Sequence, residues 1–138
     1  MCITNAHTTV WAFFMTKIVY NNCYGGFGLS KVAMLRYAEL KGITVYPQQV
    51  SSACTVYWTE PVTDGVDPNR RNSLHHSSIS RIDPVLVQVI EELGSSVASD
   101  NYAQLTICDL PVGTRYRIDE YDGNESIRTI DEYRWDVA

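Results

Sequence analysis

A glycine-rich stretch near the start of the chain limits the possible folds more than any other feature. Residues 20–30 read YNNCYGGFGLS, with three glycines among four consecutive residues. The apolar residues 18–20 before it predict a strand, and the amphipathic residues 30–41 after it predict a helix. Glycine lets the backbone turn tightly and approach another group closely. The stretch therefore predicts a strand, a tight loop and a helix in direct succession.

The loop and the start of the helix together suit a phosphate group. Ser30 stands at the expected N-cap, and a helix N-terminus carries free N–H groups and a partial positive charge. The loop sequence matches neither the P-loop motif G-x-x-x-x-G-K-[ST] nor the dinucleotide-binding motif G-x-G-x-x-G. A glycine-rich loop between a strand and a helix is also often only a tight connection. Amide and aromatic side chains around the glycines nevertheless favour a ligand site. The predicted ligand contacts here are Asn22, Cys23, Tyr24, Gly25, Gly26, Phe27, Gly28 and Ser30.

Size, charge and cysteine content narrow the classes of partner. The 138 residues suffice for one domain, and a net charge of −5 argues against capture of DNA or RNA duplexes or of an anionic membrane. The four cysteines are scattered, without a C-x-x-C pair or the His spacing of a zinc site, so a reduced cytoplasmic setting is expected. We expect no metal and no cofactor.

The first 14 residues are predicted to be an N-terminal extension. Their apolar part is too short to span a bilayer, and a second methionine, Met15, stands directly before the first predicted strand. We therefore assign residues 15–138 to a single nucleotide-binding domain.

A second helix is predicted over residues 84–93. Asp83 is the expected N-cap, Pro84 occupies the first helical position and Gly94 ends the helix. Further strands are predicted at residues 43–46, 53–58, 104–110, 114–121 and 125–128. Asp122-Gly123 predicts a hairpin turn between the last two. Because strands and helices do not alternate regularly, the expected fold is α+β, with a mainly antiparallel sheet and two principal helices.

Both helices place apolar residues away from their core stripe. Val32 and Leu35 do so on the first helix, and Val85 and Val87 on the second. Apolar side chains outside the core stripe indicate a second buried surface. We therefore expect a homo-oligomer, a dimer or a hexamer.

Residues 59–80 form a long polar stretch in which proline and Asp-Gly steps argue against regular structure. Arg71, His75 and His76 lie within it. A loop of this length is either a solvated connection or a flap that closes over a ligand. We predict Arg71 as a phosphate contact, because arginine stays charged and binds phosphate through two hydrogen bonds.

Catalytic groups are less convincing than binding groups. The candidates are Cys23 near a helix start, the adjacent His75 and His76, and the acidic residues around the hairpin. None of them forms a set of nucleophile, base and orienting group. The sequence therefore favours a binding protein over an enzyme, with no catalytic residue assigned.

Three segments carry a resemblance to a known family. They are KIVYNNCYGGFGLSK at residues 17–31, R-x-D-P-x-L-V-x-V-x-E-E-L-G at residues 81–94, and Y-x-I-D-E-Y-D-G-N-E at residues 116–125. From about Met15 onward the chain resembles the first-described phage Thoeris anti-defence sponge family. The resemblance implies an oligomeric protein of the host bacterial cytoplasm. It would sequester cyclic ADP-ribose isomers, such as glycocyclic ADP-ribose, without cleaving them, and cyclic oligonucleotides are a further ligand class in that family.

A ligand of this kind needs aromatic stacking, positive charge and acceptors for ribose hydroxyls. Beyond the loop, we therefore predict contacts from Asp119, Asp122 and Arg128 around the hairpin. Two alternatives stay open at this point. One is a nucleotide-processing hydrolase that uses the same loop, and the other is a structural or interaction module of a phage.

Overall fold

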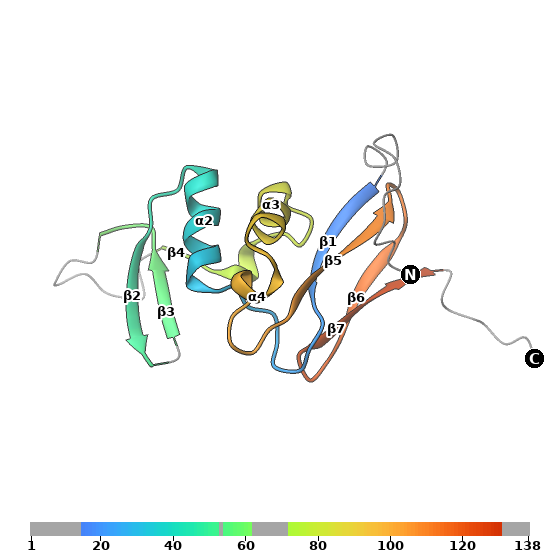
Figure 1. Cartoon of the computed structure of the whole chain (residues 1–138). Coiled ribbons are helices and arrows are strands. Elements are labelled where there is room, and N and C mark those ends of the chain that lie inside the picture. The colour runs from blue at the N-terminus through green and yellow to red at the C-terminus, as the bar shows by residue number, and fades with distance from the viewer. Residues whose placement is uncertain (1–14, 53, 62–71, 131–138) are drawn as a thin grey trace, which may run out of the picture.

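Two helices lie side by side in the middle of the molecule, between a three-stranded sheet and two pairs of longer strands (Figure 1). The structure is a computed structural model that describes residues 15–52, 54–61 and 72–130. Within these residues the strands pair only in antiparallel fashion, in three small sheets. The architecture is a single-domain α+β fold with two principal helices, which confirms the predicted class.

The ribbon formed by β1 and β5 has two covered faces. Strand β1, Met15–Asn21, pairs with β5, Leu105–Pro111, so that Ile18 lies opposite Cys108. Successive side chains of a strand point to opposite faces. Val19 packs into the main core with the helices, whereas Ile18 packs into a second core on the other face. Burial on both faces explains why this strand is continuously apolar.

The second core is closed by the predicted hairpin. Strands β6, Tyr116–Tyr121, and β7, Asn124–Thr129, are joined at Asp122 and Gly123. These two residues have φ angles of 51° and 84°, the left-handed conformation that a tight hairpin turn requires. Ile127 of β7 joins the second core, so the hairpin covers the outer face of the β1–β5 ribbon.

Helix α2, Lys31–Lys41, begins and ends as the sequence predicts. The Ser30 Oγ accepts a hydrogen bond from the Ala33 N–H at 3.1 Å, and Gly42 ends the helix with a φ of 71°. The apolar stripe is buried, whereas Val32 and Leu35 are 54% and 37% exposed.

Helix α3, Pro84–Leu93, is capped by Asp83, whose Oδ1 accepts a hydrogen bond from the Val85 N–H at 2.8 Å. A short helix, α4, Ser95–Ala98, follows directly. The expectation that Val85 and Val87 face a second surface is wrong. Both pack into the main core of this chain, because α3 is covered by α2 on one side and by the β1–β5 ribbon on another.

The small sheet differs from its prediction at β2. This strand covers Tyr46–Ser51, so Pro47 and the two glutamines lie within it instead of separating two strands. The reason is its position at the edge of the sheet, where a proline removes no hydrogen bond that a neighbour needs. Its partner β3, Cys54–Trp58, is close to the predicted strand.

Part of the long polar stretch is regular, contrary to prediction. Strand β4, Ser73–Leu74, pairs with Tyr57 and Trp58, and a 3₁₀ turn, His76–Ser78, follows it. Pairing with β3 supplies order that the local sequence does not indicate. Residues 62–71 lie outside the described residues.

Two further properties bear on the expected setting. None of the helices described is long and apolar enough to cross a membrane. Cys23 and Cys54 are free thiols, but Cys108 is disulfide-bonded, so the expectation of reduced cysteines throughout does not hold for it.

Candidate functional site

The structure brings the glycine loop and the hairpin turn together, as the predicted site requires. The Gly25 N–H donates to the Asp122 carbonyl oxygen at 3.4 Å. A Cβ added to Gly123 would lie 2.3 Å from the Gly26 nitrogen, so the two backbones touch. Two segments about 100 residues apart thus meet at one end of the β1–β5 ribbon (Figure 1).

Close contacts within the protein, or a backbone conformation that favours glycine, account for Gly25, Gly26 and Gly28 in the loop. A Cβ on Gly25 would lie 2.4 Å from the Tyr102 carbonyl oxygen, and one on Gly28 would lie 1.7 Å from the Asp100 Oδ2. Gly26 has free space around it but a φ of 98°, which side chains rarely adopt. Packing and backbone conformation therefore explain these positions without a ligand.

The polar groups that hold the loop are also satisfied internally. Asn21 is fully buried, and its Nδ2 donates to the carbonyl oxygens of Cys23 at 2.7 Å and Gly123 at 2.8 Å. Its Oδ1 accepts from the Gln104 N–H at 2.8 Å. The Cys23 Sγ donates to the Tyr102 carbonyl oxygen at 3.2 Å. This network fixes the loop between the segment that precedes β5 and the hairpin.

A partly buried ion pair lies beside the loop. The Arg81 guanidinium donates through Nη1 and Nη2 to the two carboxylate oxygens of Glu125, at 2.7 and 2.9 Å. Glu125 also accepts from the Asn21 N–H at 2.8 Å. The guanidinium lies 3.5 Å from the centre of the Phe27 ring. One face of Phe27, predicted to stack on a base, is therefore covered by Arg81.

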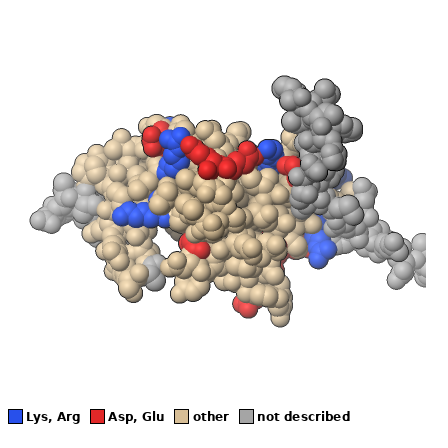
Figure 2. Space-filling model, in the orientation of Figure 1, with Lys and Arg blue, Asp and Glu red and all other residues tan. Residues whose placement is uncertain are grey.

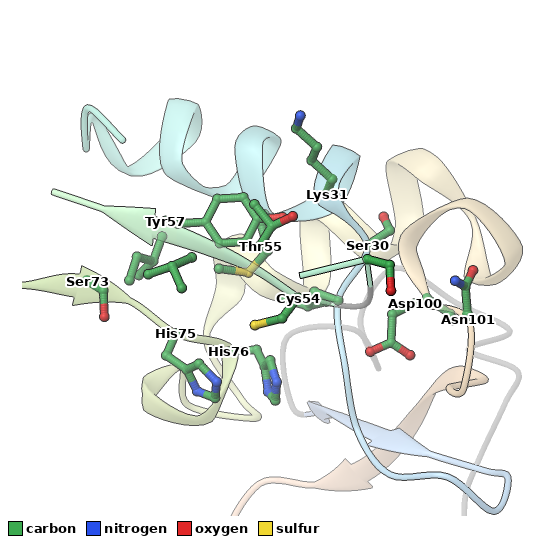
Figure 3. A pocket seen from close by; sticks show the side chains of 16 residues that line it. Ser30, Lys31, Cys54, Thr55, Tyr57, Ser73, His75, His76, Asp100 and Asn101 are labelled. Carbon is green, nitrogen blue, oxygen red and sulfur yellow. The ribbon is translucent and has the colours of Figure 1, made fainter. Parts of the chain in front are cut away.

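A cavity of about 400 Å³ opens next to the loop, at the N-terminal end of α2. Its walls come from the start of α2, strands β3 and β4, the 3₁₀ turn and the segment after α4 (Figure 3). The polar and aromatic residues that line it include Ser30, Lys31, Cys54, Thr55, Tyr57, Ser73, His75, His76, Asp100 and Asn101. Its size is in the range of small-molecule sites.

The labelled side chains divide this cavity into two walls. In Figure 3 the Cys54 sulfur and the imidazoles of His75 and His76 lie on one side, and Asp100 lies across from them. Lys31 extends away from the other labelled groups. The carboxylate and the imidazoles thus face the same space from different segments of the chain.

The start of α2 forms the end of the cavity. Ser30 is fully engaged, because its Oγ accepts from the Ala33 N–H and donates to the Val97 carbonyl oxygen at 2.6 Å. The first two N–H groups of the helix, those of Lys31 and Val32, have no acceptor within the helix. Of these two residues Lys31 lines the cavity and Val32 does not, so the Lys31 amide, and not the Ser30 hydroxyl, is the donor that α2 offers to an anion there.

The two histidines differ in their surroundings. His75 is exposed, and its Nδ1 lies 2.6 Å from the Ser77 Oγ and accepts from the Ser77 N–H at 3.2 Å. His76 is half-buried, and burial is the main cause that lowers its pKa. The positive charges of His75 and Arg81 lower that pKa further, while Asp100 acts in the opposite direction. His76 is therefore neutral near pH 7.

Of the predicted contacts, the cavity includes Ser30 alone among the residues described. The loop residues from Asn22 to Gly28 lie beside the cavity, and Asn22 and Tyr24 are exposed. Asp119 and Arg128 pair with each other at 3.8 Å on the hairpin, where Asp122 forms the turn. Arg71 lies outside the described residues.

The sequence does not indicate Tyr57, Cys54 or Asp100 as site residues, and it predicts His75 and His76 as members of a solvated connection or a flap. Asp100 carries no local signal, because its place beside Gly28 depends on a contact between residues 72 positions apart. The sequence shows that the residues after position 72 are polar, but it does not indicate that β4 pairs with β3.

Charges of both signs lie in a row over α2 and α3 (Figure 2). Arg36 pairs there with Glu92 at 2.9 Å, and Lys17 pairs with Glu91 at 2.5 Å. Such a mixture is typical of a solvated surface, unlike the basic stripe that a nucleic-acid backbone requires.

Comparison of the chain with protein-family models, with curated proteins and with solved structures finds no match.

Proposed function

We propose that the protein binds a nucleotide signal in the cavity at the start of α2 and sequesters it without cleaving it. The observation that carries this proposal is the cavity itself. It combines the helix N-terminus at Lys31, imidazole rings and a carboxylate around a volume of about 400 Å³. Pockets of this kind, with few convergent polar groups, are typical of small-molecule sites.

Each part of a nucleotide has a partner in this space. The N–H group of Lys31 at the start of α2 suits a phosphate. The Asp100 carboxylate suits ribose hydroxyls, since its Oδ1 accepts one hydrogen bond, from the Tyr102 N–H at 2.9 Å, and a carboxylate has further acceptor capacity. The rings of Tyr57 and His75 supply flat surfaces for a base.

The resemblance of the sequence to the anti-defence sponges supports a cyclic ADP-ribose isomer as the ligand. In that role a phage-type protein would act in the host bacterial cytoplasm and remove an immune signal from solution. Sequestration at nanomolar signal concentration requires a binding free energy of roughly −12 kcal/mol. Val32 and Leu35, exposed on α2, support the homo-oligomer in which further contacts would enclose the ligand.

One observation favours a second candidate, a nucleotide-processing hydrolase. The Cys54 thiol, the His76 imidazole and the Asp100 carboxylate line the same cavity. These are the group types of a nucleophile, a base and an orienting residue. A sponge and a hydrolase differ in the fate of the ligand, so one experiment separates them.

The experiment is a retention assay with cyclic ADP-ribose as the probe. The full-length protein is incubated with the probe, separated from free probe by gel filtration and denatured by heat, and the released molecules are identified by mass spectrometry. We expect intact cyclic ADP-ribose, in a stoichiometric amount. Linear ADP-ribose would instead assign the hydrolase, and absence of any nucleotide would refute both candidates.

Two tryptophan substitutions in the small sheet locate the site. Cys54→Trp places an indole in the cavity and is expected to abolish retention. Val50→Trp is the matched control, because Val50 is 54% exposed on the neighbouring strand and does not line the cavity. Equal retention by the two variants would place the ligand elsewhere, with the glycine loop and hairpin as the next candidate.

A further inference from the structure

His76 stands out among the residues that line the cavity. Its ring centre lies 5.8 Å from that of Phe27, at an interplanar angle of 52°, and 4.2 Å from that of His75, at 32°. The 3₁₀ turn that begins at His76 fixes its backbone. Ring neighbours on two sides and a fixed backbone hold the imidazole in place before any ligand arrives.

The Nδ1 of His76 is buried and has no hydrogen-bond partner. Among the described residues only one other buried side-chain atom, the Asp109 Oδ1, shares this state, and Asp109 does not line the cavity. A buried polar atom without a partner is unfavourable and calls for an explanation. The neighbouring His75 shows the ordinary case, since its Nδ1 is bonded to Ser77.

A ligand can relieve this unpaired nitrogen. The imidazole keeps nearly the same outline when it turns by half a turn about its Cβ–Cγ bond. That turn carries Nδ1 from the buried edge of the ring to the opposite edge without displacing Phe27 or His75. The ring can therefore present a nitrogen on either edge while its packing is kept.

We infer that His76 determines ligand specificity by hydrogen-bonding a neutral group of the nucleotide, its base or a hydroxyl, through Nδ1. This inference rests on the proposed function. A neutral partner is expected because a phosphate is better held by a cation than by a neutral ring. His76 stays neutral near pH 7, with His75, Arg81 and Asp100 as the charged or titratable groups around it.

The test is calorimetric titration of the full-length protein and three variants with cyclic ADP-ribose. His76→Leu keeps a side chain of similar volume without nitrogen, and we expect it to bind at least about tenfold more weakly. In His76→Asn the amide overlays Nδ1, so its affinity should stay within about threefold of the original. Gln49→Leu is the control, because Gln49 is exposed and does not line the cavity, and this variant too should stay within about threefold.

Melting temperatures separate recognition from a structural role. Because His76→Leu removes an unpaired buried nitrogen, it should melt at the same temperature as the original protein or higher while binding more weakly. If His76→Leu binds like the original protein, the inference is wrong, and it is also wrong if the loss of affinity in His76→Leu comes with a lower melting temperature. If the unsubstituted protein retains no nucleotide, the proposed function fails as well; if only His76→Leu is without effect, the inference alone fails.

Discussion

The glycine loop and the cavity beside it use their polar groups in opposite ways. In the loop, the Asn21 side chain, the Cys23 thiol and the Gly25 amide are bonded to the segment before β5, the hairpin or the loop itself. In the cavity, the His76 Nδ1 has no partner, and the N–H group of Lys31 has no acceptor within α2. The groups that anchor the glycine loop are thus already bonded within the protein, whereas the cavity contains hydrogen-bonding groups that are not used.

The comparison shows that a glycine-rich loop is not by itself evidence of a ligand site. Gly28 is small because the Asp100 carboxylate fills the space beside it. That carboxylate then lines the cavity. The loop therefore contributes to the candidate site by positioning a residue of a distant segment, and direct contact of the loop with a ligand stays a prediction.

The largest expected effect is a loss of stability when the ion pair between Arg81 and Glu125, beside the glycine loop, is removed. Arg81→Ala leaves the Glu125 carboxylate, which is only 9% exposed, without its cationic partner. The Arg81 side chain is itself 25% exposed, so the loss of unfolding free energy should be about 3 kcal/mol, at the lower end of the range for buried pairs. Urea denaturation of the full chain measures the change.

Lys17→Ala provides the control for that measurement. Lys17 pairs with Glu91, but the two side chains are 43% and 47% exposed. Exposed pairs contribute about 0–1 kcal/mol, so the control should lose little stability. Equal losses of unfolding free energy in the two variants would show that the Arg81–Glu125 pair does not stabilise the loop region. The glycine loop would then again be a candidate for the ligand site.

A second prediction compares two aromatic residues of the loop. Phe27 packs between Arg81 and His76, so Phe27→Ala should cost about 2 kcal/mol, less than the roughly 3–5 kcal/mol of a fully buried phenylalanine. It should also weaken cyclic ADP-ribose binding about tenfold, because the His76 ring loses a neighbour. Tyr24 is 64% exposed, and Tyr24→Ala should change stability by less than about 0.5 kcal/mol and leave binding unchanged.

Denaturation and ligand titration of these two variants show whether the ligand binds in the cavity or at the glycine loop. The sequence alone predicts Phe27 as a ligand contact. The structure shows a ring already covered on one face, which changes the expected effect on stability. A loss of affinity in Tyr24→Ala would indicate that the ligand binds at the glycine loop.

Local signals account for what the sequence predicts correctly. Caps at Ser30 and Asp83, the apolar stripe of α2 and the Asp-Gly hairpin each depend on a few neighbouring residues. Pro47 within β2 and the short β4 depend on the place of a strand in its sheet, which local propensity does not encode. The α+β class follows from the local signals, while sheet membership does not.

The candidate site was less predictable than the fold because its walls come from distant segments. Asp100 meets Gly28, and Arg81 meets Glu125, across 72 and 44 positions respectively. Charge and spacing show which residues are able to bind a nucleotide, but not which of them the fold brings together. Arg128 is an example, because it pairs with Asp119 on the hairpin and does not line the cavity.

The smallest expected effect is a pH dependence that belongs to the cavity and not to the loop. Burial lowers the pKa of His76 below its ordinary value of 6.5, with His75 and Arg81 acting in the same direction and Asp100 opposing them. Below pH 6.5 the unfolded chain takes up a proton at this residue, while the folded chain does so only at lower pH. The unfolded state then binds more protons, so stability falls as the pH falls through this window.

One titrating group limits the slope of this effect to about 1.4 kcal/mol per pH unit. His76→Leu should remove this contribution between pH 6.5 and the lowered pKa, whereas His75→Asn should leave most of it in place. Unfolding free energies of the two variants and the original protein, measured at several pH values in this window, provide the comparison. Since binding uses the neutral ring, affinity for cyclic ADP-ribose should stay flat from pH 6.5 to 8. Affinity that rises as histidine becomes protonated would mean that the cavity holds its ligand through cationic imidazole, and the neutral-group recognition assigned to His76 would be wrong.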